Sequence, residues 1–206
     1  MEKEIKVKNF PNLRTVYLSG EINGDTLQQF KKDLDILIQA DEDVFEENVR
    51  NLKSVSQILS DTYAKTMEYP PIVLDMTSPG GYIYTGLALY DIIRNYNLNS
   101  KHKIIARVSG LIASAATIVI LACDERECGK NTTFMIHSVA SWCSGKVQDM
   151  EDDLEETKRL ADIMKGIYTE RTNITLKQLK EVDKLKKDWV LTADEAKDLG
   201  LITNIL

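Results

Sequence analysis

The sequence is poor in several residue types that carry chemistry, and each shortage excludes some classes of functional site. It contains two histidines, three cysteines and four prolines in 206 residues. The cysteines, Cys123, Cys128 and Cys143, are odd in number and form no CxxC pair, which argues against a disulfide framework or a zinc site. We therefore expect no metal and no cofactor, and only His102 and His137 are available for histidine-dependent chemistry.

Long apolar runs and an excess of basic charge are also missing. No stretch approaches the ~18–20 uncharged apolar residues of a membrane span, since Ser114 and Thr117 interrupt the apolar run Leu111–Cys123. The charged segment Met1–Phe10 does not resemble a secretion signal. The net charge of −6 argues against the basic face of a nucleic-acid binder. We predict a cytoplasmic protein with neither membrane nor nucleic-acid partners.

The chain has the length and apolar content of one α/β domain covering residues 1–206. Hydrophobic residues make up 43% of the sequence, and no linker rich in proline, glycine or serine divides it. Short β-type runs alternate with amphipathic helical patterns, which predicts a mainly parallel sheet covered by helices. The predicted strands are Thr15–Gly20, Ile72–Met76, Lys103–Val108, Thr133–His137 and Leu201–Ile205.

Helical patterns fill the intervals between these strands. Apolar residues at three- and four-residue steps between Thr26 and Met67 predict two helices that break near Asp41–Asp43. Lys146–Arg171 predicts a long amphipathic helix and Thr175–Leu185 a shorter one. The last helix opens with a capping box, Thr192 to Glu195, and ends at Gly200.

Two glycine-containing turns follow predicted strands and open helices. Ser78-Pro79-Gly80-Gly81 can present backbone N–H groups outward, or it can be a plain strand-to-helix turn. In Gly110–Ala116, small residues surround Ser114 at the start of the apolar helix. That serine can be an exposed nucleophile near a helix N-terminus or an ordinary N-cap.

His137 ends the run Thr-Phe-Met-Ile-His, 23 residues after Ser114. A lone histidine at a strand end is often structural. His102 lies in a polar lysine-flanked turn, where we expect it to be exposed, so His137 is the better candidate base. A hydrolytic serine needs such a base, and an acid to orient it. With 32 carboxylates in the chain, spacing alone does not identify the acid.

Several motifs together resemble ClpP, the proteolytic subunit of the caseinolytic protease. Around the serine the family pattern is close to G-x-A-A-S-M-G, around the histidine close to M-I-H-Q-P, and near the C-terminus close to D-x-F/W-L/M-S/T-A-x-E-A. These motifs occur in the same order along this chain. The corresponding segments are Ser78–Gly81, Gly110–Ala116, Met135–His137, Asp188–Ala196 and Leu199–Ile202.

The resemblance implies a serine endopeptidase that cleaves unfolded proteins or peptides. It assigns Ser114, His137 and Asp188 to a catalytic triad, and the backbone N–H groups of Gly81 and Ala115 to an oxyanion hole. It also implies the ClpP/crotonase fold of repeated ββα units with a helix–strand handle supplied by the segment from Ser138. Family members form homo-oligomers of stacked heptameric rings, with active sites inside a chamber.

The chain departs from the family pattern in three places. The interval from Gly20 to Ser78 is longer, with an inserted helical segment at about residues 35–67. The resemblance implies an AAA+ unfoldase partner, yet the segment before Thr15 lacks the Y-D-I-Y-S-R-L-L signature of the axial pore. Ala115-Ala116 replaces Met-Gly, and Ser138-Val139 replaces Gln-Pro. Such departures are typical of a divergent member, such as one encoded by a phage.

Three other interpretations fit parts of the sequence. A peptidase resembling signal peptide peptidase A uses a lysine base, whereas Met135–His137 and the Asp188 motif favour the ClpP type. A crotonase-type acyl-CoA enzyme also holds an oxyanion with glycine-rich turns, but needs no nucleophilic serine. A catalytically silent assembly subunit keeps the fold without turnover.

Overall fold

The computed structural model describes residues 7–10 and 14–206 of the chain. Within them a seven-stranded sheet runs in the order β1-β2-β3-β4-β7, and β5 and β6 branch from β3. All the ladders are parallel except β5–β6. The predicted mainly parallel α/β fold is therefore confirmed. The strands are β1 (Thr15–Ser19), β2 (Ile72–Ser78), β3 (Ile104–Ala113), β4 (Arg126–Cys128), β5 (Thr133–Ile136), β6 (Trp189–Leu191) and β7 (Asn204–Ile205).

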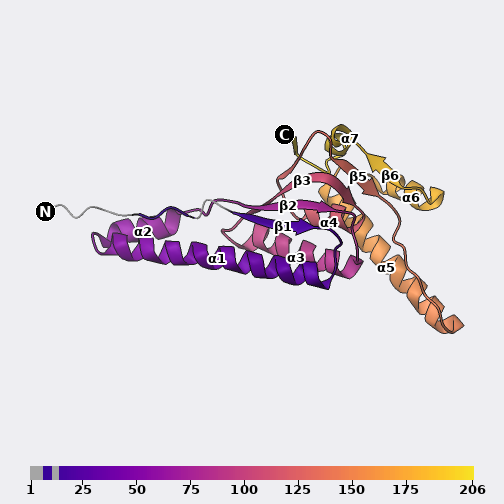
Figure 1. Cartoon of the computed structure of the whole chain (residues 1–206), viewed down its shortest axis with the longest axis horizontal. Coiled ribbons are helices and arrows are strands. Elements are labelled where there is room, and N and C mark those ends of the chain that lie inside the picture. The colour runs from indigo at the N-terminus through magenta and orange to yellow at the C-terminus, as the bar shows by residue number, and fades with distance from the viewer. Residues whose placement is uncertain (1–6, 11–13) are drawn as a thin grey trace.

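Helices cover the sheet and extend beyond it on two sides. Figure 1 shows α1 and α3 lying along β1 and β2, while the α1–α2 hairpin projects in one direction and α5 in another. Alternate residues of β2 are buried, and Ile72, Leu74 and Met76 belong to the main core. The helices are α1 (Gly24–Lys53), α2 (Gln57–Thr66), α3 (Ile83–Asn99), α4 (Ala115–Leu121), α5 (Val147–Arg171), α6 (Leu176–Leu185) and α7 (Ala193–Asp198).

The helix break predicted near Asp41–Asp43 is wrong. Helix α1 continues to Lys53, and the chain turns at residues 54–56 before α2 begins at Gln57. Asp41 faces inward rather than toward solvent: it is fully buried and accepts hydrogen bonds from the Arg14 guanidinium at 2.5 and 2.8 Å. A charged side chain therefore lies on the inner face of this helix, where a pattern of exposed charges had indicated an interruption.

The strand predicted to end at Val108 also runs further. Strand β3 continues through Ser109 and Gly110 to Ala113, and α4 is limited to Ala115–Leu121. The additional residues pair with β5, since Leu111, Ile112 and Ala113 lie opposite Thr133, Phe134 and Met135. Ser109, Gly110 and Leu111 are all exposed, so the alternation of the strand breaks here, and the Ser-Gly pair is typical of a turn.

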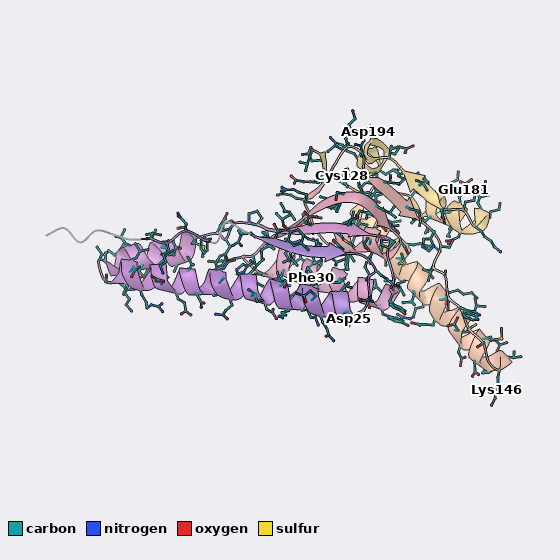
Figure 2. All side chains as sticks on the ribbon, in the orientation of Figure 1. Asp25, Phe30, Cys128, Lys146, Glu181 and Asp194 are labelled. Atoms are coloured by element: carbon teal, nitrogen blue, oxygen red, sulfur yellow. The ribbon has the colours of Figure 1, made fainter. Side chains whose placement is uncertain are left out.

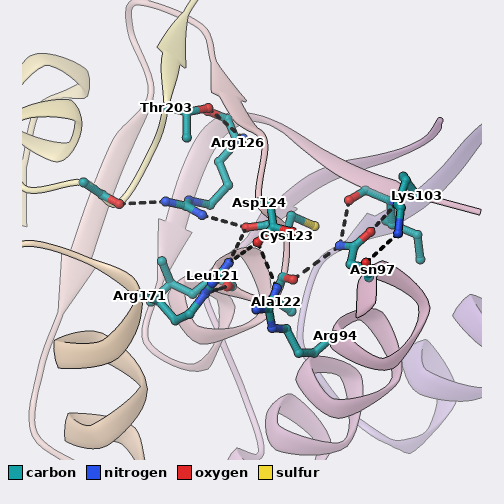
Figure 3. Close-up of polar contacts among 12 residues, drawn as sticks. Arg94, Asn97, Lys103, Leu121, Ala122, Cys123, Asp124, Arg126, Arg171 and Thr203 are labelled. Atoms are coloured by element: carbon teal, nitrogen blue, oxygen red, sulfur yellow. Dashed lines mark hydrogen bonds and ion pairs between the residues drawn. The ribbon is translucent and has the colours of Figure 1, made fainter. Parts of the chain in front are cut away.

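Basic and amide side chains anchor the C-terminal end of α4. The Arg171 Nε donates to Leu121 O at 3.0 Å, the Arg126 Nη1 to Cys123 O at 2.6 Å, and Asn97 Nδ2 to Ala122 O at 3.3 Å. Figure 3 shows these donors converging on the helix end from separate elements. Cations stabilise the carbonyl end of a helix, so this cluster fixes the helix that follows Ser114.

The handle expected after Ser138 corresponds to α5 and the residues before it. Helix α5 carries Lys146 at its far end, away from the sheet (Figure 2). Residues 138–146 run beside it without a hydrogen-bonded strand in this single chain. Among the described residues, no helix has the length and apolar character needed to cross a membrane. Most of the segment before Thr15, which lacks the pore signature of the family, lies outside the described residues, since residues 1–6 and 11–13 are not described.

Candidate active site

Ser114 lies in the sharp turn between β3 and α4. Its backbone has φ 55° and ψ −128°, a conformation that L-residues rarely adopt and that concentrates at functional sites. Its N–H donates to Met135 O at 2.9 Å, which ties the turn to β5. The side chain makes no capping hydrogen bond to α4, so the N-cap alternative is not supported. The hydroxyl is left available for another partner.

That partner is His137. The Ser114 Oγ and His137 Nε2 atoms lie 2.8 Å apart, within hydrogen-bond distance. The pairing of Ala113 with Met135 brings the two together, because Ser114 directly follows Ala113 and His137 lies two residues after Met135. The structure thus joins two of the residues that the sequence indicated. The other histidine, His102, is buried elsewhere, so the prediction that it is exposed is wrong.

The turn after β2 lies directly against Ser114. Gly80 has φ +98°, and a Cβ there would lie 2.6 Å from Ser114 Cβ and 2.7 Å from Ala113 O. Gly81 has φ +150°, and its Cβ would lie 2.2 Å from Ile22 O. Only glycine fits these close approaches without displacing backbone. A plain strand-to-helix turn therefore does not account for the close approach of Gly80 to the serine.

Gly81 and Ala115, the two residues predicted to supply backbone N–H groups, border this site. Ile22 bonds to Gly80 O and accepts from Tyr82 N, both at 2.8 Å, so the N–H of Gly81 points away from that bridge. Ala115 is the first residue of α4, where a backbone N–H has no partner within the helix. Gly81 and Ala115 both line the same cavity as Ser114.

The cavity beside Ser114 has a volume of about 390 Å³. Leu160 and Met164 of α5 give it an apolar wall, and residues 137–141 form another side. At the mouth, the Tyr84 hydroxyl hydrogen-bonds to Glu156, which also accepts from Arg159 Nε at 2.7 Å. The hydrogen bonds from Arg159 and Tyr84 lower the pKa of Glu156 to about 2, so this carboxylate is ionised at neutral pH.

Asp188, the third predicted triad residue, lies apart from the serine–histidine pair. Its side chain is exposed, and among the described residues it makes no hydrogen bond to His137. It lines a separate cavity with residues of α6 such as Val182 and Leu185. Its backbone is nevertheless close to His137 along the ladder, because Ile136 pairs with Trp189.

A polar group that the sequence analysis missed lies next to His137. Ser138 Oγ donates to Asp183 Oδ1 at 2.8 Å, and Lys165 Nζ lies 2.5 Å from Asp183 Oδ2. The three residues come from three separate parts of the chain. The only signal in the sequence was the serine that replaces the family's glutamine after the histidine.

Taken together, the α/β fold and this site define a protein with a serine–histidine pair at the edge of a cavity, backed by a glycine turn. The Clp protease family model matches residues 20–206. The chain is 26% identical over 202 residues to ATP-dependent Clp protease proteolytic subunit 2 of Treponema pallidum, covering 97% of this chain and 85% of that protein.

Further relatives agree with this match. Proteolytic subunit 3 of Rhizobium etli is 29% identical over 134 residues, and that of Rhizobium meliloti is 30% identical over 141 residues. These matches cover 64% and 66% of this chain, and 66% and 67% of the relatives. A ClpP1 mutant from Listeria monocytogenes has a TM-score of 0.69 at 25% identity, covering 95% of this chain and 92% of that structure. The chain belongs to the Clp protease family, which supports a peptidase function and the ClpP fold.

Proposed function

We propose that the chain is a serine endopeptidase in which Ser114 is the nucleophile and His137 the general base. The observation that carries the proposal is the 2.8 Å approach of Ser114 Oγ to His137 Nε2 beside an open cavity. His137 takes the hydroxyl proton as Ser114 attacks a peptide carbonyl, and returns it to the leaving amine. Water then releases the acyl group by the same route.

In this proposal, the N–H groups of Gly81 and Ala115 stabilise the oxyanion that forms during attack. The free orientation of the Gly81 N–H and the position of Ala115 at the start of α4 support this role. Each such donor contributes about 3–4 kcal/mol in the transition state. Because both donors are backbone groups, replacing the family's methionine by Ala115 leaves the role intact.

Asp188 completes the proposed triad after a local rearrangement. The next pair along the β5–β6 ladder after Ile136–Trp189 is His137 and Asp188, whose side chains would leave the ladder on the same face. The exposed Asp188 side chain has freedom to turn toward His137 when the site is occupied or when subunits assemble. Catalytic hydrogen bonds are often long in the resting state and tighten in the complex.

We further propose that the protein acts on peptides or unfolded proteins inside a homo-oligomeric chamber of heptameric rings, as the relatives' family implies. The single domain then carries the α1–α2 hairpin as its insertion, at about residues 35–67, and α5 as its handle. Apolar side chains exposed on α5 support contact between subunits. They include Val147, Met150 and Leu154.

Covalent labelling tests the proposal directly. A fluorophosphonate probe, read by intact mass, should give a single adduct on the native chain and none on Ser114→Ala. Ser109→Ala is the matched control, because Ser109 is an exposed serine on the same strand, and it should label normally. Absence of an adduct on the assembled protein would favour the crotonase-type or silent-subunit alternatives, neither of which needs an activated serine.

A further inference from the structure

Next to His137, three elements meet at a partly buried ion pair. Ser138 directly follows the histidine, Lys165 belongs to α5, and Asp183 belongs to α6. The Asp183 carboxylate is divided between them: one oxygen accepts from the Ser138 hydroxyl at 2.8 Å, and the other lies 2.5 Å from Lys165 Nζ. Both oxygens of this carboxylate are therefore engaged.

The charges of Asp183 and Lys165 are partly buried, so their electrostatic interactions are only weakly screened by water. The Lys165 side chain is 18% exposed and that of Asp183 35%, well below the values for the ion pair of Arg50 and Glu46 on α1. Asp183, Lys165, Ser138 and His137 all line one small cavity. Charges that face a narrow, partly buried space are screened less by water than charges on the surface.

The geometry points to Asp183 as a positioning residue, which holds His137 within reach of Ser114 through Ser138 while Lys165 balances its charge. This inference rests on the proposed function, in which His137 is the general base. Asp188 is a separate group, because it precedes β6 and makes no hydrogen bond to Ser138 among the described residues. A serine in place of the family's glutamine is what allows the hydrogen bond to α6.

Other charged groups also surround the histidine and must be separated from Asp183. Helix α5 presents Asp153 and Glu156 to the neighbouring cavity, the latter paired with Arg159, and it carries Asp162 at 3.9 Å from Lys165 Nζ. Asp188 precedes β6, and Glu181 and Lys187 lie beside it. Tyr168 of α5 lines the small cavity but remains neutral, because burial raises its pKa.

The two charges act on the imidazole in opposite directions. In Asp183→Asn the amide oxygen can still accept from Ser138, but a negative charge is lost and Lys165 is left unbalanced. Protonation of His137 then becomes less favourable. In Lys165→Met the carboxylate is left unbalanced, and protonation becomes more favourable. We expect the titration midpoint of His137 to move downward in Asp183→Asn and upward in Lys165→Met.

The experiment is an NMR titration of the histidine ring protons in the full chain, with His137 assigned by the loss of its signal in His137→Gln. The pH profile of fluorophosphonate labelling is measured in parallel, and its acid limb should move with the titration. Ser138→Ala keeps both charges, so it should slow labelling at least threefold without moving the midpoint. Asp162→Asn removes a carboxylate that is 82% exposed near the same lysine, and should change neither quantity.

The outcomes separate this inference from the proposed function. Opposite shifts in Asp183→Asn and Lys165→Met, with slower labelling in Ser138→Ala, support it. Midpoints equal to that of the native chain in both charge variants would overturn it, even if Ser114 labels. A native chain that fails to label would instead contradict the proposed function, and the titration would still report the charge coupling. Because Lys165→Met and Ser138→Ala leave Asp183 in place, misfolding of one variant does not remove the test.

Discussion

Ile136 and Trp189 form the last pair of the antiparallel β5–β6 ladder, immediately before His137 on one strand and after Asp188 on the other. This register brings His137 and Asp188, which are 51 positions apart in the chain, to facing positions. The Asp188 side chain is exposed in the resting chain and is not bonded to His137 within the described residues. The backbone thus places the proposed acid near the base, while the side-chain contact has still to form.

Replacing Asp188 tests whether that contact forms. If Asp188 orients His137 in the working enzyme, Asp188→Asn should lower the rate of peptide hydrolysis by about a thousandfold or more, since the wrong tautomer of histidine is then favoured. Hydrolysis of a fluorogenic peptide measures the effect. Asp198→Asn, an exposed carboxylate at the end of α7, is the control and should keep the native rate. An unchanged rate in Asp188→Asn would remove this residue from the triad.

Gly80 tests the close approach of the turn to the nucleophile. In Gly80→Ala the new Cβ would meet Ser114 Cβ at 2.6 Å, so the serine must move and labelling should fall by at least tenfold. Stability should drop by about 1–3 kcal/mol, because the residue also has φ +98°. Gly166→Ala lies inside α5 with open space around it, and should instead stabilise by about 0.5–1 kcal/mol. Chemical denaturation and labelling rates together check both expectations.

The buried ion pair between Arg14 and Asp41 anchors α1 to the start of β1. Asp41 is fully buried and Arg14 is 8% exposed, so Asp41→Ala leaves an uncompensated buried charge. We expect a loss of about 3–5 kcal/mol in the free energy of unfolding. Glu46→Ala breaks an exposed pair with Arg50 on the same helix, and should change stability by less than about 1 kcal/mol. Equal urea midpoints for the two variants would contradict the role of the buried pair.

His102 should make the stability depend on pH. Its ring stacks on Tyr69, with centroids 3.9 Å apart, and burial lowers the pKa of His102 despite the attraction of Asp41. The unfolded chain therefore binds more protons near pH 6 than the folded one does. This contribution to stability is complete above about pH 6.5 and is lost as the pH falls below it.

Urea unfolding at pH 7.5 and 5.5 measures this contribution. The decrease in stability between the two pH values should be smaller in His102→Gln than in the native chain. Asn99→Gln, an exposed change that involves no titratable group, is the control and should retain the native decrease. An undiminished decrease in His102→Gln would mean that carboxylates alone cause the acid sensitivity.

Much of the fold could be predicted from local patterns. The strand–helix alternation predicted the parallel sheet, the capping box from Thr192 to Glu195 is present, and the long helix ending at Arg171 was located correctly. Strands β4 and β6 have three residues each, too short to show a periodicity, and were missed. The end of β3 was missed because Ser109, Gly110 and Leu111 are all exposed, which breaks the alternation expected of a strand.

The sequence by itself indicated Ser114 and His137 as the candidate nucleophile and base, because their motifs are local and the chain has only two histidines. It also determined the glycine turn at Gly80 and Gly81, where only a residue without a side chain fits. The family resemblance indicated Asp188, whereas tertiary structure alone revealed the contacts of Asp183. One acidic residue resembles another in a chain that has 32 of them. Helix packing brings Asp183 to Ser138, next to His137, and the β5–β6 register places the backbone of Asp188 near His137. Tertiary packing also explains why α1 continues past Asp41. The buried Arg14 side chain compensates the charge of Asp41, so the helix need not end there.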